Sequence, residues 1–267
     1  MRYDLAKSGN GLTYEIRNIV NVANKLKKSG VEIYWENIGD PVVKGEILPD
    51  WMKEELSNIL KDDNAFAYSP TKGVLETREF IAAKVNARGG VQINAEDIIF
   101  FNGLGDAIAR CYSAIRVDAR IIIPEPTYST HLLAEVLHAS FPPNTYQMNP
   151  YKNWTPDLDE LESKVRSYNS IVGILVVNPD NPTGHVFTED ELRRIVSIAK
   201  EYDLMLIFDE IYANMAYNGT KTVLLSDIIG DVPGISMKGI SKEYPWPGAR
   251  CGWIEVYNYD KDPAFQR

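Results

Sequence analysis

The 267-residue chain is poor in the features that hold metals, cross membranes or bind nucleic acids. Its two cysteines (Cys111, Cys251) and three histidines form no CxxC or Cys/His spacing, so we expect buried thiols and surface or hydrogen-bonded histidines, without a metal site. No apolar run is long enough to cross a membrane, and the first residues lack the apolar core of a signal peptide. The formal net charge is −9, and no Lys/Arg-rich run is present. We therefore expect a cytoplasmic globular protein with neither a membrane nor a nucleic-acid partner.

Apolar runs and amphipathic segments alternate along most of the chain. Strands are predicted at 98–101, 120–124, 145–148, 171–177 and 204–208. Helices are predicted near 74–88, from about Asp106, from about Ser129, within 156–168, and after a capping box formed by Thr188 and Glu191. This alternation predicts an α/β fold with a mostly parallel central sheet and helices on both faces.

The N-terminal part has a different pattern. A helix is predicted from Thr13 to Lys28, with Gly30 as its C-terminal cap, followed by a strand over 31–39. A connector over 39–49 then leads to a helix that starts after Pro49. We therefore divide the chain into a small N-terminal segment, 1–47, and a main body, 48–267.

Polar and glycine-rich segments follow the predicted strands. They are Asn102–Gly105 after 98–101, 124–128 at the end of 120–124, 178–184 after 171–177, Asp209 after 204–208, and Ser241-Lys242 after a candidate strand at 234–239. In a parallel sheet, loops and helix N-termini converge at the carboxyl ends of the strands. The sequence therefore predicts one ligand site built from these segments.

Three motifs in order, NPDNPTG at 178–184, FDEIY at 208–212 and SKEYPWPGARCGW at 241–253, resemble the fold-type-I pyridoxal-phosphate (PLP) aminotransferases of class I/II. The resemblance runs from about Ile38 to Trp253. It implies PLP as the cofactor and a Schiff base at Lys242. A partly dry site beside the cationic Arg250 would keep that amine uncharged part of the time.

The resemblance implies a role for four further side chains. Asp209 would pair with the protonated pyridine nitrogen, although a helix N-cap is an alternative reading. Asn181 and Tyr212 would hydrogen-bond the phenolic oxygen of the cofactor, and Asn181 could equally be a turn residue between prolines. Tyr128 would stack on the pyridine ring, or simply pack at a helix start. The expected catalytic residues are Lys242, Asp209 and Tyr212.

The cofactor phosphate needs several hydrogen-bond donors. By resemblance they are the helix start at Gly103, Leu104 and Gly105, the hydroxyl of Ser241, and a bidentate Arg250. Many relatives carry a further hydroxyl residue three positions before the lysine, where this chain has Gly239, so one phosphate hydrogen bond is expected to be missing or taken by water.

Two other residues concern the substrate and the assembly. Tyr68 resembles the tyrosine that reaches the phosphate of a neighbouring subunit, which implies a homodimer, and packing within its own chain would remove that support. Gly39, with Asn181, resembles the lining of the substrate pocket, and a turn glycine accounts for Gly39 equally well.

The expected activity is transfer of the amino group of an L-amino acid, with alanine and aspartate as candidates, to a 2-oxo acid. Two alternatives stay open: a PLP-dependent C–S lyase of the same fold, and a fragment that binds PLP without turnover. Relatives of this kind are considerably longer and place the arginine that grips the substrate carboxylate beyond the position of Arg267. By resemblance, 1–47 belongs to the small domain and 48–267 is a large PLP-binding domain, incomplete at its C-terminus.

Overall fold

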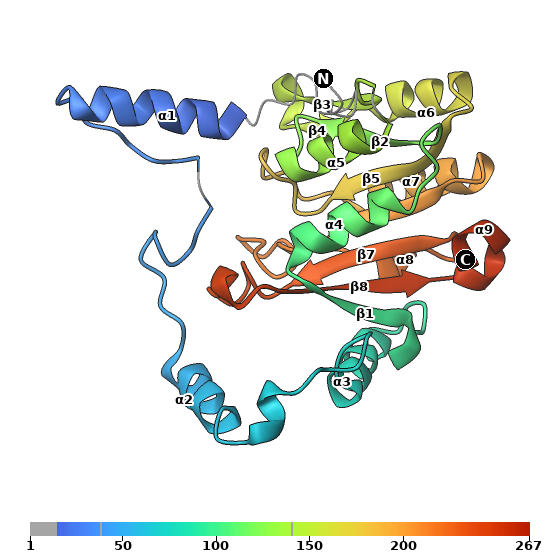
Figure 1. Cartoon of the computed structure of the whole chain (residues 1–267). Helices are drawn as coiled ribbons and strands as arrows, with labels where there is room; N and C mark the ends of the chain where they lie inside the picture. Colours follow the sequence, from blue (N-terminus) through green and yellow to red (C-terminus); the bar gives the residue numbers. More distant parts are fainter. Residues whose placement is uncertain (1–14, 38, 140) are drawn as a thin grey trace, which may run out of the picture.

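The computed structural model describes residues 15–37, 39–139 and 141–267, and over these residues the chain forms an eight-stranded sheet (Figure 1). Its strand order is β1-β8-β7-β6-β5-β2-β3-β4. The strands are β1 Ile98–Asn102, β2 Arg120–Glu125, β3 Thr145–Asn149, β4 Thr155–Pro156, β5 Ile171–Val177, β6 Met205–Asp209, β7 Gly234–Gly239 and β8 Cys251–Tyr257. Pairing from β7 to β3 is parallel, whereas β8 is antiparallel to both neighbours and β4 is antiparallel to β3. The predicted, mostly parallel sheet is confirmed.

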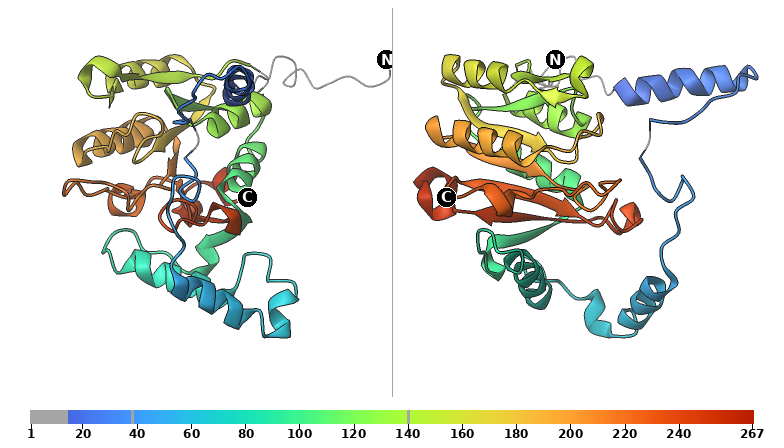
Figure 2. Two further views of the ribbon diagram at one scale, coloured as in Figure 1. Left: turned by 90° about the vertical axis from the view of Figure 1, so that its left-hand side faces the viewer. Right: turned by 180° about the vertical axis from the view of Figure 1, so that it is seen from behind.

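Helices cover both faces of this sheet, as predicted. The α-helices are α1 Glu15–Lys28, α2 Asp50–Ile59, α3 Leu75–Asn86, α4 Leu104–Ser113, α5 Ser129–Ala139, α6 Leu158–Ser167, α7 Glu189–Glu201, α8 Leu225–Ile228 and α9 Pro263–Gln266. One apolar core lies between the sheet and α3, α6, α7 and α8, and a second lies between the sheet and α4, with α5 and α9 beside it. The side view in Figure 2 shows α4 on the side of the sheet opposite α6 and α7.

Helix α7 illustrates how the sequence encodes these elements. The Thr188 hydroxyl accepts a hydrogen bond from the Glu191 amide at 3.2 Å, and the Glu191 carboxylate accepts one from the Thr188 amide at 2.8 Å. This confirms the predicted capping box. Leu192, Ile195 and Ile198 follow at helical spacing and are buried against the sheet, so one stripe of the helix joins the core.

The N-terminal part extends away from the sheet (Figure 1). Helix α1 is present from Glu15, whereas the predicted start at Thr13 lies outside the described residues. The predicted strand at 31–39 is wrong over its described part, since 31–37 and Gly39 belong to no sheet. A strand needs a neighbour to satisfy its backbone groups, and no strand of the described residues pairs with this segment, whose Tyr34 is exposed.

Two further features concern the expectations that the chain does not cross a membrane and that its thiols are buried. No helix in the described ranges is both long and apolar enough to span a bilayer. Cys111 and Cys251 are free thiols, and both are half-buried where full burial was expected.

Candidate active site

Six neighbouring strands bring the predicted site residues to one edge of the sheet. The carboxyl ends of β1, β7, β6, β5 and β2 share this edge with the amino end of the antiparallel β8. The residues found there are Gly103 after β1, Arg250 before β8, Lys242 after β7, Asp209 at the end of β6, Asn181 after β5 and Tyr128 after β2. Segments far apart in sequence therefore meet, as expected for a ligand site at strand ends.

Lys242 is in contact with the N-terminal part of the chain. Its Nζ donates a hydrogen bond to the Gly39 carbonyl at 2.5 Å and lies 5.9 Å from the centroid of the Tyr212 ring. A Cβ on Gly39 would lie 3.6 Å from this Nζ and 3.9 Å from the Tyr212 hydroxyl, so the glycine backbone approaches both closely. Burial lowers the pKa of Lys242, although Asp40 and Asp209 act in the opposite direction. The neutral amine is therefore more accessible here than at a surface lysine.

Asp209 is buried and held from two sides. One carboxylate oxygen accepts a hydrogen bond from the Ile211 amide at 3.1 Å, and the other lies 3.0 Å from Nε2 of His131. Strand β6 continues into a turn and not into a helix, so the N-cap alternative for Asp209 is wrong. The carboxylate instead projects from the strand end toward helix α5.

His131 was missed by the sequence analysis, which treated it as an ordinary surface or hydrogen-bonded histidine. It is fully buried, and its Nδ1 has no hydrogen-bond partner among the described residues. Its ring lies edge-on to Tyr128, with the two ring centroids 6.3 Å apart. The available signal was its position in the first turn of the helix that follows Tyr128, three residues after that tyrosine.

The phenol of Tyr212 keeps its proton at neutral pH. Burial raises its pKa to about 12, and the nearby Asp209 and Tyr128 act in the same direction. Tyr212 is therefore a hydrogen-bond donor at the site. Tyr128 is about one third exposed (36%), and Asn181 is half-buried in the turn after β5.

A cradle for an anion lies at the start of α4. The helix begins at Leu104, two residues before the predicted start, because Gly103 turns the chain at a φ of 83°. A Cβ on Gly103 would lie 2.4 Å from Nη2 of Arg250, so the guanidinium rests directly on this glycine. A Cβ on Gly252 would lie 2.7 Å from the Leu104 amide nitrogen. A cationic fork and the unpaired amides of a helix start therefore share one spot.

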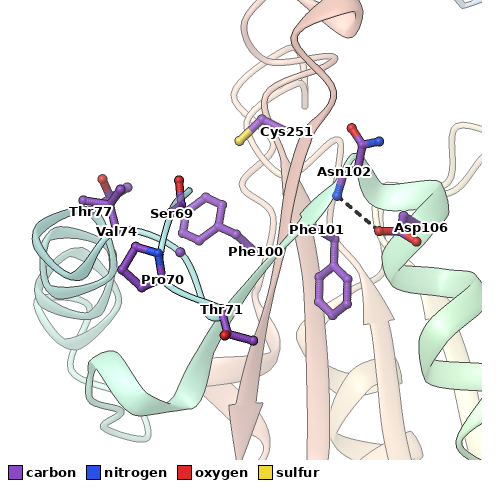
Figure 3. Close-up of a pocket in the computed structure, with 11 residues that line it drawn as sticks. Ser69, Pro70, Thr71, Val74, Thr77, Phe100, Phe101, Asn102, Asp106 and Cys251 are labelled. Atoms are coloured by element: carbon purple, nitrogen blue, oxygen red, sulfur yellow. Dashed lines mark hydrogen bonds between the residues drawn. The ribbon is translucent and has the colours of Figure 1, made fainter. Parts of the chain in front are cut away.

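A cavity of about 540 Å³ lies between the start of α3 and β1, and its lining includes Asn102 and Cys251, the chain neighbours of Gly103 and Arg250 (Figure 3). It is lined by the loop and helix start from Ser69 to Thr77, by β1, and by Asp106 and Cys251. The Asn102 amide donates to the Asp106 carboxylate at 3.3 Å beside it. Tyr68, which precedes the lining loop, is fully exposed and packs against none of the residues that the structure describes. Ser241 is half-buried next to Lys242.

The chain is similar to known proteins over most of its length. The family model for aminotransferase class I and II matches residues 37–259. An uncharacterized aminotransferase of Methanocaldococcus jannaschii is 59% identical over 256 residues, which cover 96% of this chain and 59% of that protein. The glutamate-pyruvate aminotransferase AlaA of Escherichia coli is 30% identical over 254 residues, 94% of this chain and 61% of that protein. The crystal structure of an aminotransferase from Escherichia coli matches with a TM-score of 0.90 at 27% identity, over 98% of this chain and 65% of that chain.

These matches also show what share of each relative's length corresponds to this chain. The chain spans about three fifths of the length of the curated relatives named above. The matched part includes every candidate site residue from Gly39 to Arg250.

Proposed function

Because the chain belongs to the class I and II aminotransferases, we propose that it binds PLP at Lys242 and moves the amino group of an L-amino acid to a 2-oxo acid. The observation that carries this proposal is the meeting of Lys242, Asp209 and the cradle of Arg250 and Gly103 at one edge of the sheet. A half-buried amine, a buried carboxylate and an anion cradle are the three unlike groups that this cofactor requires.

The residues fit the cofactor on geometric grounds. The absence of a side chain at Gly103 leaves room for the Arg250 guanidinium at the start of α4, where a phosphate group would meet both the cation and the helix amides. The buried carboxylate of Asp209 suits a cationic ring nitrogen, because a buried charge needs a partner of opposite sign. The lowered pKa of Lys242 suits an amine that reacts with an aldehyde.

PLP, when bound, supplies an aldehyde for the amine and a ring that accepts electrons from the substrate's alpha carbon. Lys242 would hold the cofactor through Nζ and, once free, would carry a proton to and from the substrate's alpha carbon at that same atom. Asp209, oriented by His131, would keep a positive charge on the ring nitrogen. Tyr212 would donate its phenol proton to the cofactor's phenolic oxygen.

The remaining predicted residues complete the proposed site. Asn181 would add a second donor to the phenolic oxygen, Tyr128 would stack on the ring, and Ser241 would reach the phosphate with the amides of Leu104 and Gly105. The full exposure of Tyr68 supports a homodimer in which this tyrosine reaches the neighbouring site. We keep the proposed division into a small-domain segment, 1–47, and a large domain from 48, and we propose a cytoplasmic location.

For the substrate we propose alanine as the donor. One relative is named as a glutamate-pyruvate aminotransferase, and pyruvate is the 2-oxo acid that corresponds to alanine. In addition, Gly39 contacts Lys242 at the place where we propose that a small substrate enters. Aspartate is the second candidate.

The test is a visible absorption spectrum with added PLP, followed by borohydride reduction and peptide mapping. We expect one reduced adduct at Lys242, and none in Lys242→Ala. An adduct elsewhere, or none, refutes the proposed site. Alanine with 2-oxoglutarate should then yield pyruvate and glutamate. Release of pyruvate and ammonia from a cysteine derivative without an acceptor indicates a lyase instead, and an adduct without turnover indicates a binding fragment.

A further inference from the structure

Glu210, the neighbour of Asp209, belongs to a buried ionic cluster on the opposite face of the sheet. We define the cluster by its members on three adjacent strands or strand ends: Glu210, Ser236, Lys238, Trp253, Glu255 and Tyr257. Glu210 and Glu255 are 2% and 1% exposed, and the Lys238 side chain is 14% exposed. The proposed mechanism uses none of these residues.

Each carboxylate oxygen of the cluster has a partner. On Glu210, one oxygen accepts from the Leu225 amide at 2.7 Å, and the other accepts from the Ser236 hydroxyl and lies 3.4 Å from Nζ of Lys238. Glu255 accepts from the Trp253 indole at 3.1 Å and the Tyr257 hydroxyl at 2.8 Å. Its second oxygen also lies 3.0 Å from the Lys238 ammonium. One lysine therefore serves two carboxylates.

The strand geometry relates this cluster to the site. Successive residues of a strand point to opposite faces, so Asp209 faces α5 while Glu210 faces the core under α7 and α8. Asp209 pairs in register with Met237, and the Glu210 amide donates to the Met237 carbonyl at 2.9 Å. Glu210 and Lys238 thus lie side by side, one residue beyond the last paired residues of β6 and β7. Lys238 is four residues before Lys242. The cluster thus links the end of β6, which carries Asp209, to β7, which precedes Lys242.

Stability alone does not require such a cluster. Apolar side chains of similar volume often stabilise a fold as well as a buried ion pair does, whereas in some proteins the buried ion pair specifies one arrangement. Here the specified arrangement is that of the two strand ends that carry the candidate catalytic groups.

We propose that Glu210, held by Lys238, is a positioning residue that sets the direction of the Asp209 carboxylate toward His131 and the cofactor ring. The effect on cofactor binding rests on the proposed function. The effect on the Asp209 carboxylate and His131 does not, because both residues belong to this chain. Removing the charge of Glu210 or Lys238 should therefore alter the contact between Asp209 and His131, although that contact lies on the opposite face of the sheet.

The experiment compares Glu210→Gln and Lys238→Met with Tyr146→Phe as the matched control. The control removes a buried hydroxyl on β3 that donates to the Leu175 carbonyl of β5 at 2.9 Å, outside the cluster. The first readout is the ¹⁵N resonance of the His131 ring in the cofactor-free protein, assigned by its loss in His131→Phe. The second is the affinity for PLP and the pH midpoint of the visible band after loading.

We expect both cluster variants to shift the His131 resonance and to weaken PLP binding by about tenfold. Tyr146→Phe should lower the melting temperature without either effect. A cluster variant that melts earlier but keeps the His131 resonance of the wild type overturns the proposal, because the cluster is then only structural.

Two provisions keep the result decisive. If the wild type takes up no PLP at Lys242, the proposed function fails, while the His131 resonance of the cofactor-free protein still decides the positioning role. If Glu210→Gln does not fold, Ser236→Ala removes one donor to the same carboxylate and is read in the same way.

Discussion

Nε2 of His131 lies 3.0 Å from a carboxylate oxygen of Asp209, and neither residue is more than 2% exposed. The contact joins helix α5 to the end of β6, which are 78 positions apart in sequence. Because a carboxylate only accepts, Nε2 carries the proton and donates it. The pair holds Asp209 in one orientation.

We expect His131→Phe to destabilise the cofactor-free protein by about 1–3 kcal/mol, because it leaves a buried carboxylate oxygen without this donor. PLP affinity should fall by about tenfold, which corresponds to about 1.4 kcal/mol. Urea unfolding and spectroscopic titration measure the two effects. His138→Phe is the control on the same helix, since it removes a contact with the Ala119 carbonyl, and it should keep PLP affinity. Equal PLP affinities of the two variants would contradict the role of His131.

The anion cradle predicts opposite outcomes for two glycines. In Gly103→Ala, the new Cβ would collide with the Arg250 guanidinium and would sit at a φ of 83° and a ψ of 162°, a conformation that costs a non-glycine residue about 1–3 kcal/mol. We expect PLP affinity to fall at least about tenfold. A Cβ on Gly105 meets nothing within 4 Å, so Gly105→Ala should be neutral or gain about 0.5–1 kcal/mol of stability.

Pyridoxal, which lacks the phosphate, serves as the control ligand for these two variants. It should bind both alike, because the cradle recognises only the anion. Loss of pyridoxal binding in Gly103→Ala would mean that the substitution damages more than the cradle.

The charge of Asp40 should slow the reaction of Lys242 with aldehydes. Burial lowers the pKa of Lys242, and the charge of Asp40 partly opposes this effect. Asp40→Asn should therefore lower the pKa of Lys242 further and increase the fraction of neutral amine at a given pH. We expect PLP addition at pH 8 and low salt to become about two- to threefold faster. Stopped-flow absorbance measures this rate.

The matched control is Asp62→Asn on a distant turn. Asp40 accepts from the Val42 amide and Asp62 from the Asn64 amide, and asparagine can keep either contact. Asp62→Asn should leave the rate unchanged. A slower reaction of Asp40→Asn would show that its turn, and not its charge, matters to Lys242.

The fully exposed Tyr68 predicts complementation between subunits. Chains carrying Tyr68→Ala and chains carrying Lys242→Ala should each bind PLP poorly as homodimers. In a mixed dimer, one site would receive the intact Lys242 of the first chain and the intact Tyr68 of the second. PLP bound per mixed dimer should therefore approach half of the wild-type value, whereas absence of recovery would place Tyr68 in the site of its own chain.

The sequence predicted the fold where local pattern decides the outcome. The runs at 120–124 and 171–177 became buried central strands because apolar side chains there can face helices on both sides. The resemblance carried by the three motifs is confirmed, since the family model matches residues 37–259. The roles of the individual site residues stay predictions.

Features that depend on spatial neighbours could not be predicted in this way. The segment 31–39 has strand-like residues, but its described part finds no strand to pair with. His131 fits no motif, because its importance comes from meeting Asp209 across the fold. The cluster around Lys238 likewise follows from the register of β7 with β8, which sequence periodicity does not specify.

The alternation of Asp209 and Glu210 makes this part of the chain intolerant of changes in length. Insertion of one residue in β6 would move Asp209 to the face that carries Lys238, and deletion of one residue would move Glu210 to the face that carries His131. In either case the carboxylates would lose the partners that they have in this structure. Changes in loop length near this site are thus expected in the exposed turn around Asn218 and Gly219, and not between Phe208 and Tyr212.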